Sequence, residues 1–524
     1  NGTLPFALSL TIDENTTLNA SQQDADLSNQ NGGLIETSGT TLNLLSSINA
    51  GRGGVWLLDP NNVTISAAAT TGGFTPSYTA TAGTSVVNAT EIQNQINAGT
   101  SVTIIANGTI TQTSNLSFAP AAGLSASLTY DTRTGTTQMI TLTGTTTNTG
   151  AGTVTLNYLS SGQIYINGAI NSTSTGKINV VAQTTYATNT LATCTSGACA
   201  SIYNSATGSI TTKGGYVVLD ATGGTIAGTT ITMGSIQNGP IYLNAGINTT
   251  TSGAAGSSVG GNFSLAASNN LGNGIGSYEP NVAPLNIGGN ASFQLKTYSP
   301  GNYGFVVASY LTTSPITAYG NLDISSTGFS AAGNGLIYLS SAVASTTGNI
   351  TLTATSTNTT STTNPGVSSI AAGTITANAG TVTINSNSNA SSAVVLAGVI
   401  SAKAISITGT STTASTIVSL GAMTIVSGGS NLSVVANNSA GGASTGITQT
   451  GAIADNAAGS SITFTSNNVI NQTGAITLVA NTSGTIANIT YDATAGTKAS
   501  NITSGALTIG TGTSASAVNY IVKS

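Results

Sequence analysis

Short runs in which apolar and polar residues alternate recur along this chain of 524 residues. Thr and β-branched residues dominate the runs, and Gly, Asn or Ser-Gly turn signals bound them, so each run predicts a short strand. No long apolar stripe at helical spacing survives the density of Gly, so no amphipathic helix is expected. The clearest runs lie at 154–156, 164–166, 178–180, 217–219, 241–243, 350–352, 382–384, 405–407, 432–434, 462–464 and 476–478.

The intervals between runs predict how the strands are arranged. Val217 is followed by Ile241 after 24 residues, and Val382 by Ile405 after 23. The phrase ITQT also recurs, at 110–113 and at 447–450. Repeats of about 20 residues made of short strands and turns are typical of β-solenoids. We therefore predict an all-β parallel β-helix, a β-solenoid whose coils stack by parallel strand pairing around a narrow core.

Composition supports a narrow core. Hydrophobic residues make up 39% of the chain, but aromatic residues only 5% and charged residues only 4%. A β-sandwich would need more aromatic residues, and the Asn-Gly pairs of this chain do not systematically join strands as hairpin turns would. We therefore expect an elongated rod with loop insertions.

Charge bounds the partners. Eight Lys and Arg stand against thirteen Asp and Glu, a formal net charge of −5. So few cations cannot neutralise a run of phosphates, which excludes nucleic-acid binding. No apolar run approaches the roughly 20 residues of a membrane-spanning helix, so no membrane insertion is expected. The first residues also lack the basic region of a signal peptide, so an exported chain would already be in its mature form.

The only cysteines are Cys194 and Cys199, and the chain has no His. A zinc site would need two further strong ligands that the neighbourhood does not offer, and a redox motif would favour the tighter C-x-x-C spacing. We expect a small local disulfide, with free thiols as the alternative. A disulfide would suit an oxidising, extracellular setting.

One stretch departs from the uniform remainder, since residues 32–66 hold the only Trp, one of two Arg and the one Asp-Pro pair. Its phrases GGLIETSG (32–39) and GGVWLLDP (53–60) are followed by ATEIQNQINAGTSVTIIANGTITQTSNLSF (89–118). Together they strongly resemble large exoproteins of the filamentous-haemagglutinin type, secreted by the two-partner route of Gram-negative bacteria. The match is specific over residues 31–120.

The resemblance implies a right-handed parallel β-helix, an extracellular or cell-surface location, and the role of an adhesin. The family's conserved secretion domain has no counterpart at residues 1–30, which leaves the secretion route open. We expect a processed mature product, or a relative reduced to its solenoid. The expected organisation is an N-terminal strand, cap or donor segment (1–30), a solenoid (31–514) and a terminal strand (515–524). Within the solenoid, residues 31–120 form specialised coils and 121–514 irregular repeats.

The unusual stretch has a structural interpretation that we prefer to a chemical one. Glu36, Arg52 and Asp59 could serve as an acid, a cation and a base. The glycines at 51, 53 and 54 instead permit a tight turn. Trp56 can then fill a wide part of the core, and Asp59 and Pro60 form an extended exit turn. We predict a coil where the cross-section changes.

Catalysis is not expected. Carboxylates after residue 60 are scattered, so a pair would need stacking between coils, for example at Asp220. Asp131 and Arg133 are expected to form only a surface ion pair. With no His, a Ser-His-Asp arrangement is excluded. We therefore expect no enzyme, metal or cofactor, with a polysaccharide-degrading enzyme as the least favoured alternative.

Twenty Asn-x-Ser/Thr sequons occur along the chain. That number is what the composition produces by chance, so it shows no selection. Some relatives implied by the resemblance carry sugars at such sites, and glycosylation is therefore a hypothesis. Candidate positions are Asn107, Asn171, Asn262 and Asn358.

Both ends carry strand-like apolar segments. Open solenoid ends expose unpaired edges that template further pairing, so the segments either cap their own molecule or add to a neighbour's sheet. We favour a non-catalytic secreted subunit that stacks head to tail with itself into adhesive surface filaments. The alternative is a monomeric adhesin that binds glycans or cell-surface receptors. The candidate assembly residues are Leu4, Phe6, Leu8, Leu10, Val518, Tyr520 and Val522.

Overall fold

The computed structural model of the chain is almost entirely β in the residues that it describes. The chain forms two compact units: the first holds 1–189, 197–254 and 259–266, and the second holds the remainder. The described residues are 10–13, 15–21, 32–38, 42–44, 47–59, 61–68, 84–186, 200–234, 241–251, 260–269, 278–280, 284–297, 305–307, 315–328, 336–356, 365–389, 392–412, 416–438, 445–478, 486–494, 501–509 and 517–523.

Each unit is built from coils of three strands, two short and one longer. One coil of the first unit consists of β16 (Ile164–Ile166), β17 (Ile170–Ser172) and β18 (Ile178–Thr184). We call these positions the first, second and third series. Each strand pairs in parallel with its counterpart in the next coil, as Ile164 with Ile202 and Val180 with Val217. The prediction of a parallel β-solenoid is therefore confirmed for each unit.

The first unit begins with two small sheets and contains a hairpin insertion. The small sheets pair β1 (Leu10–Ile12) with β4 (Leu42–Leu44) and β2 (Thr17–Asn19) with β5 (Ser47–Asn49), both in parallel. The hairpin is β22 (Thr225–Ala227) with β23 (Thr230–Thr232), which pair antiparallel. Its Ile231 packs on Val218 and Ala266, covering the outer side of the third series there.

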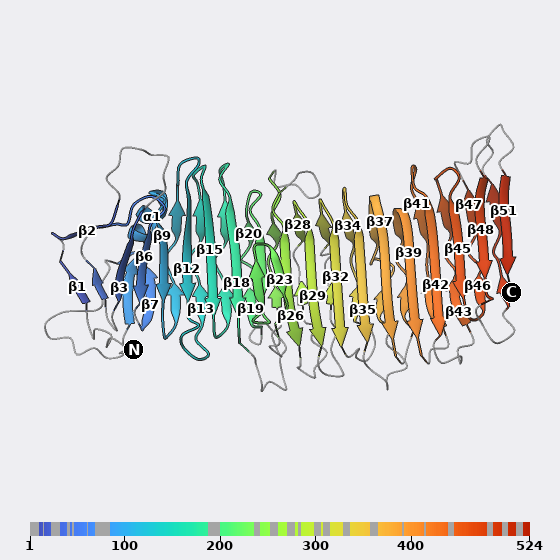
Figure 1. The fold of residues 1–524 in the computed structure, drawn as a ribbon, viewed down its shortest axis with the longest axis horizontal. Coiled ribbons are helices and arrows are strands. Elements are labelled where there is room, and N and C mark those ends of the chain that lie inside the picture. Colours follow the sequence, from blue (N-terminus) through green and yellow to red (C-terminus); the bar gives the residue numbers. More distant parts are fainter. Residues whose placement is uncertain are drawn as a thin grey trace. The chain divides into compact units, whose positions relative to one another are not determined.

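The remaining strands of the first unit belong to the three series. The first series, in stacking order, is β8 (Thr84–Asn88), β7 (Asn62–Ser66), β10 (Ile110–Gln112), β13 (Ile140–Leu142), β16, β19 (Ile202–Asn204) and β24 (Ile241–Leu243). Although β8 follows β7 in the chain, it pairs with the edge of β7 that faces away from β10. The second is β11 (Leu116–Phe118), β14 (Thr146–Asn148), β17, β20 (Ile210–Thr211) and β25 (Ile247–Asn248). The third is β3 (Leu34–Ser38), β6 (Val55–Asp59), β9 (Ser101–Ile105), β12 (Ser125–Asp131), β15 (Thr153–Ser160), β18, β21 (Val217–Asp220) and the start of β26 (Phe263–Asn269). Figure 1 shows β12, β15 and β18 side by side.

The second unit repeats the arrangement. The first series is β27 (Tyr278–Pro280), β30 (Phe305–Val307), β33 (Ile337–Leu339), β36 (Val367–Ser369), β38 (Val394–Leu396), β40 (Thr416–Leu420), β43 (Thr445–Gln449), β46 (Ile470–Gln472) and β49 (Ile502–Thr503). The second is β28 (Leu285–Ile287), β31 (Ile316–Ala318), β34 (Val343–Ser345), β41 (Met423–Ile425), β44 (Ile453–Asp455), β47 (Ile476–Leu478) and β50 (Leu507–Ile509). The third is β29 (Ala291–Thr297), β32 (Leu322–Gly328), β35 (Ile350–Ser356), β42 (Asn431–Asn438), β45 (Ser461–Ser466), β48 (Ile486–Asp492) and β51 (Ala517–Lys523). In β37 (Ile375–Ser388) and β39 (Ile400–Ser411), second and third series are continuous.

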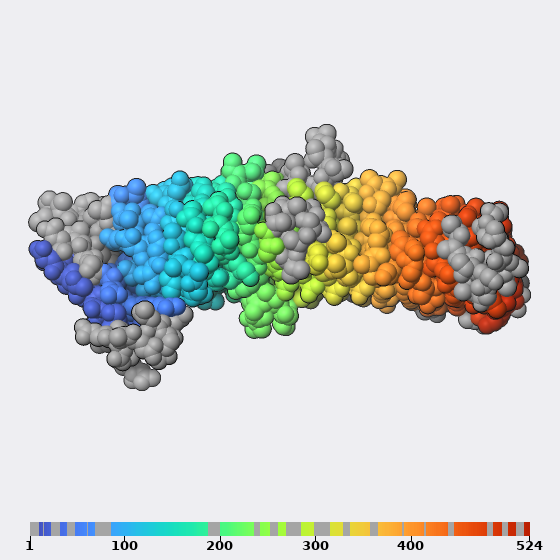
Figure 2. All heavy atoms as spheres, turned by 90° about the horizontal axis from the view of Figure 1, so that it is seen from above, coloured from blue at the N-terminus to red at the C-terminus, as the bar shows by residue number. Residues whose placement is uncertain are grey.

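The core of each unit is a set of stacked aliphatic columns. In the first unit, Ile110, Ile140 and Ile164 are register partners on successive coils, and each is fully buried. In the second unit, Ile447 stacks on Ile470 in the same way. Residues between the buried ones face outward, which produces the alternating burial of most strands. Within each unit of Figure 2 the colours follow chain order without mixing, because each coil contacts its neighbours.

The register confirms one predicted interval and corrects the other. Val382 is the partner of Ile405, so 23 residues are one coil. Val217, however, pairs with Phe263, and Ile241 pairs with Ile202, so the prediction that Val217 and Ile241 are one coil apart was wrong. The two strands belong to different series, and the β22–β23 hairpin lengthens the segment between them. Short apolar runs of different series look alike in the sequence.

The expectation that no helix occurs was wrong. Residues Ala89–Asn97 form α1, whose N-cap Asn88 accepts a hydrogen bond from the Thr90 amide through its side chain. Only Ala89, Ile92 and Ile96 are buried, so the apolar stripe is too short to stand out in the sequence. Gln95 Nε2 donates to the Ile48 carbonyl of β5 at 2.6 Å. On the other side, Gln93 and Asn97 accept from backbone amides that flank or lie in β11. The helix thus takes the place of a strand in the second series.

Candidate functional site: the open C-terminal coil

The last described coil, formed by β49, β50 and β51, ends in an exposed edge. β51 pairs with β48, and among the described strands none pairs with its other edge. Tyr520 and Val522 are register partners of Ile489 and Tyr491, which are fully buried. Tyr520 and Val522 themselves are 45% and 51% exposed. Side chains that continue the core column therefore lie open at this end.

The second series shows the same opening. Leu507 and Ile509 of β50 align with the buried Ile476 and Leu478 of β47. Their exposed fractions are 38% and 40%. Large apolar side chains at core positions normally lose nearly all exposure in a folded protein. The last coil therefore presents a cross-section of the solenoid core together with a row of unpaired backbone groups.

An aromatic column ends at this edge. The rings of Phe464 and Tyr491 stack at a centroid distance of 5.4 Å, and the rings of Tyr491 and Tyr520 lie 5.5 Å apart at a tilt. The Tyr491 hydroxyl donates to Gln472 Oε1 at 2.9 Å. Burial, and secondarily Tyr520, raise the pKa of Tyr491 above its ordinary range. The ring that would cover the other side of Tyr520 is not provided by the described residues.

The N-terminal coils differ, because their core positions are covered. Ile35 and Thr37 of β3 are 8% and 0% exposed. Trp56 on β6 is fully buried, and its indole Nε1 donates to Thr37 Oγ1 at 3.1 Å. Gly51 and Gly53 have φ of 80° and 73°, the left-handed region that the tight turn before β6 requires. The stretch around Trp56 thus packs as a coil of the solenoid.

The charged residues of this stretch lie on two neighbouring strands and at the turn before the second of them. Glu36 and Asp59 lie on the neighbouring strands β3 and β6. Partial burial, and then the negative charge of Glu36, raise the pKa of Asp59. The Arg52 carbonyl accepts from the Gly32 amide, which places Arg52 at the turn before β6. Two carboxylates at the N-terminal coils therefore repel each other.

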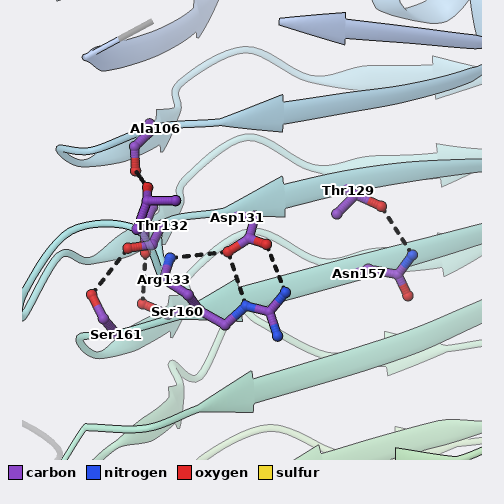
Figure 3. A network of polar contacts seen from close by, with 9 residues as sticks. Ala106, Thr129, Asp131, Thr132, Arg133, Asn157, Ser160 and Ser161 are labelled. Carbon is purple, nitrogen blue, oxygen red and sulfur yellow. Dashed lines mark hydrogen bonds and ion pairs between the residues drawn. The ribbon is translucent and has the colours of Figure 1, made fainter. Parts of the chain in front are cut away.

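Figure 3 shows the predicted ion pair of Asp131 and Arg133 at the turn after β12. Arg133 binds Asp131 through Nε at 3.0 Å and Nη2 at 2.7 Å, and the Arg133 amide donates to the same carboxylate. Beside it, Thr132 Oγ1 contacts Ser160 Oγ at 3.1 Å, and Ser161 Oγ donates to the Thr132 carbonyl. The contacts of Thr132 join successive turns, whereas the bonds between Asp131 and Arg133 lie within one turn.

Asp220 has no stacked carboxylate among its described partners. Its side chain is fully buried and accepts from Gln183 Nε2, from the Gly224 amide and from Thr222. It holds the base of the β22–β23 hairpin. Across the described ranges, no group of three or more His, Cys, Asp or Glu residues is placed to hold a metal ion.

The other residues that the sequence analysis singled out lie partly within and partly outside the described ranges. Asn107 is exposed in a turn, whereas Asn171 and Asn262 are half-buried, and Leu10 is half-buried in β1. Outside the described residues lie Leu4, Phe6, Leu8, Pro60, Cys194, Cys199 and Asn358. Sequence reasoning missed Leu507 and Ile509, although their I-x-L-like alternation marks them as core positions.

Comparisons add no relative to this picture. Within the described part of the chain, no helix is long and apolar enough to span a membrane. No protein-family model matches the chain, and no curated protein matches it at a significant level.

Proposed function

We propose that the chain is a structural subunit whose open C-terminal coil receives the N-terminal coil of a second copy, so that copies stack head to tail into a filament. The observation that carries this proposal is the exposure of core-position side chains on β50 and β51. A second parallel solenoid offers matching chemistry, since one edge of its β3 pairs with no described strand and could pair in parallel with β51. Among the described strands, β3 pairs only with β6.

Charge complementarity supports a second copy as the occupant. Residues 1–59 contain six carboxylates (Asp13, Glu14, Asp24, Asp26, Glu36 and Asp59) against one cation, Arg52. Residues 486–524 contain two cations, Lys498 and Lys523, and one carboxylate, Asp492, which lies 3.4 Å from Lys523. Opposite charges at the two ends favour head-to-tail contacts and disfavour contacts between like ends. Burial, and then the charge of Glu36, raise the pKa of Asp59, and a cation brought near both carboxylates would offset the second of these causes.

Coverage of the last coil supplies the driving force. Leu507, Ile509, Tyr520 and Val522 each retain between 38% and 51% exposure, and each continues a column that is fully or almost fully buried one coil earlier. Burying a large apolar side chain completely contributes about 1.5–3 kcal/mol. The N-terminal side chains Ile35 and Thr37 gain little, so the C-terminal coil dominates the energetics.

Electron microscopy with negative stain and sedimentation velocity, both over a concentration series, test the proposal. Val522→Asp places a charge at a core position of β51, and Ile521→Asp places the same charge on the outward side of the same strand. Ile521 is 40% exposed, similar to Val522 at 51%, so the two variants form a matched pair. We expect fibres of uniform width from the unaltered chain and from Ile521→Asp, and single particles from Val522→Asp. Circular dichroism checks that each variant stays folded.

Two other outcomes would overturn the proposal. Dimers of fixed mass at every concentration would mean that two C-terminal coils pair with each other. Single particles of the unaltered chain at every concentration would mean that another partner or segment covers β51.

The resemblance to filamentous-haemagglutinin-type exoproteins supports placing these filaments outside the cell, at a bacterial surface, with an adhesive role. An extracellular location suits a chain with little charge and many Thr, Ser and Asn side chains on its outward faces. Detection of the protein in culture supernatant or on intact cells by antibody labelling tests the location, and labelling only after lysis would contradict it.

A further inference from the structure

Three tyrosines form a column on the outside of the first unit. Tyr165, Tyr203 and Tyr242 are the central residues of β16, β19 and β24, and they are register partners on successive coils. In each strand the residues before and after the tyrosine are buried, whereas the tyrosine is half-buried. The three rings therefore lie on the outward face of the first-series sheet. We call them the tyrosine column.

The rings leave part of their faces uncovered by one another. Tyr165 and Tyr203 meet edge to face, with centroids 5.9 Å apart and planes at 68°. In such a pair one ring points its edge at the face of the other, so the faces of the first ring are not covered by the second. Tyr203 and Tyr242 are stacked at 27°, but their centroids are 6.3 Å apart. That distance exceeds the strand spacing of about 4.8 Å, so these rings are offset.

The described partners of the column on its N-terminal side are polar and uncharged. The Tyr165 hydroxyl donates to Gln163 Oε1 at 2.9 Å. Towards the N-terminus, the outward positions in register with the tyrosines are all threonines, namely Thr141, Thr111 and Thr64. The face thus combines aromatic rings, hydroxyl groups and an amide at register positions of six successive strands.

This combination selects one class of partner. Without cations, the column cannot hold phosphates or acidic polymers. A purely apolar partner would leave the hydroxyl and amide groups without hydrogen bonds. Neutral sugars satisfy both requirements, because a sugar ring has C–H groups on one face and hydroxyl groups at its rim, and tyrosine has an apolar body with a polar tip.

We propose that the tyrosine column is a binding surface for a neutral polysaccharide chain laid across the strands. Successive sugar rings contact successive tyrosine rings, and the phenol groups and Gln163 bond the sugar hydroxyls. The tyrosine column shares no residue with the C-terminal coil, so the test of this inference does not depend on filament assembly.

Affinity electrophoresis of the whole chain through gels that contain one soluble neutral polysaccharide tests the proposal. The probes are a β-glucan, an α-glucan and a mannan, with polygalacturonate as the acidic comparison. Tyr203→Ala removes the central ring, and Tyr203→Phe keeps the ring without its hydroxyl. The control is Tyr338→Ala, because Tyr338 is the central residue of β33 in the second unit but has Val306 and Ser368 as register partners.

We expect retardation by at least one neutral probe and none by polygalacturonate. Tyr203→Ala should weaken binding by about tenfold, as expected for a central aromatic contact, and Tyr203→Phe by less than about threefold. Tyr338→Ala should bind like the unaltered chain. The proposal is overturned if no neutral probe retards the protein, if Tyr203→Ala binds as well as the unaltered chain, or if Tyr338→Ala is equally impaired. Circular dichroism of each variant excludes unfolding as the cause, and the Phe variant tests the ring even if the Ala variant unfolds.

Discussion

The side-chain amide of Gln472 donates through Nε2 to Oε1 of Gln449 at 2.9 Å, and the two residues lie at the same corner of successive coils. Both side chains are fully buried. Gln472 Oε1 also accepts from the Tyr491 hydroxyl and from the Gly505 amide, each at 2.9 Å. The same corner in the first unit holds Gln112, which accepts from the Tyr130 hydroxyl. The recurring ITQT phrase therefore marks a corner where a buried amide joins the strand to its neighbours.

Gln472→Ala is expected to destabilise the second unit by about 2–3 kcal/mol, because the Tyr491 hydroxyl and the Gly505 amide lose their acceptor. Thr477→Ala on the outward side of β47 is the control and should change the free energy of unfolding by less than about 0.5 kcal/mol. Urea denaturation followed by tyrosine circular dichroism measures both. Equal stabilities of the two variants would mean that the corner amide is not structurally important.

The helix α1 should protect the neighbouring strand. Replacing Gln93 and Asn97 by Leu removes the acceptors of the Ser117 and Ala119 amides, at a cost of about 1 kcal/mol each. We expect faster hydrogen exchange at these two amides than in the unaltered chain. Thr90→Ala, on the exposed side of the same helix, serves as the control and should leave exchange in β11 unchanged. Unaltered hydrogen exchange in the double variant would mean that Gln93 and Asn97 do not protect the Ser117 and Ala119 amides.

Thr37→Val leaves the indole N–H of the only tryptophan without its acceptor. Because Trp56 is fully buried, we expect a loss of about 1–3 kcal/mol. The intrinsic fluorescence of Trp56 reports unfolding of the first unit alone, since this unit holds the one Trp of the chain. Thr64→Val, at a half-buried outward position of β7, should unfold like the unaltered chain. A Thr37→Val variant of unchanged stability would show that Trp56 finds another acceptor.

Asp455 gives the second unit a pH dependence. Burial raises its pKa, against the opposing hydrogen bonds from Ser460 and the Ala457 amide. A raised pKa means that the folded state binds the proton more tightly than the unfolded state. This contribution is complete below the ordinary value of 3.8 and is lost as the pH rises through the folded-state pKa.

Asp455→Asn should therefore be more stable than the unaltered chain at neutral pH, with the difference vanishing below pH 3.8. In the unaltered chain the Ala457 amide donates a hydrogen bond to Asp455 Oδ1 at 3.0 Å, and Asn keeps an oxygen that can accept this bond. Denaturation of both proteins across this pH range provides the measurement. A difference independent of pH would show that the carboxyl group does not titrate differently on unfolding.

Exchange of charges between the two ends tests the orientation of the proposed filament. Lys523→Glu and Glu36→Lys should each raise the concentration needed for assembly by about two- to fivefold, as for exposed ion pairs, and added salt should do the same. Lys523→Glu also breaks the ion pair with Asp492 within the chain, at 3.4 Å, so the double variant is the decisive test. Combining both substitutions should restore part of the loss. Lys403→Glu changes the net charge equally at an exposed position of β39 and is the control. Failure of the double variant to recover would argue against contact between these ends.

The local pattern was readable from the sequence because inward and outward residues alternate in a strand regardless of what lies next to it. Ile164 and Ile166 are buried on either side of the outward Tyr165, as their alternation predicts. The interval from Val382 to Ile405 was correctly predicted as one coil, because the loops between the strands are short there. The resemblance of residues 31–120 contributed the expectation of a parallel β-helix.

The series to which each strand belongs was decided only by the tertiary structure. Val217 and Ile241 have equivalent local patterns, yet they stack on different partners, because register depends on the length of every intervening loop. The helix α1 has three buried residues and is stabilised by bonds to β5 and to the region of β11, which no local window contains. Likewise Gln472 reads as an ordinary polar residue, and its burial follows from partners 23 and 19 residues away. The sequence by itself determined where strands form, since that depends on neighbouring residues. Stacking determined what each strand contacts, since those contacts are long-range.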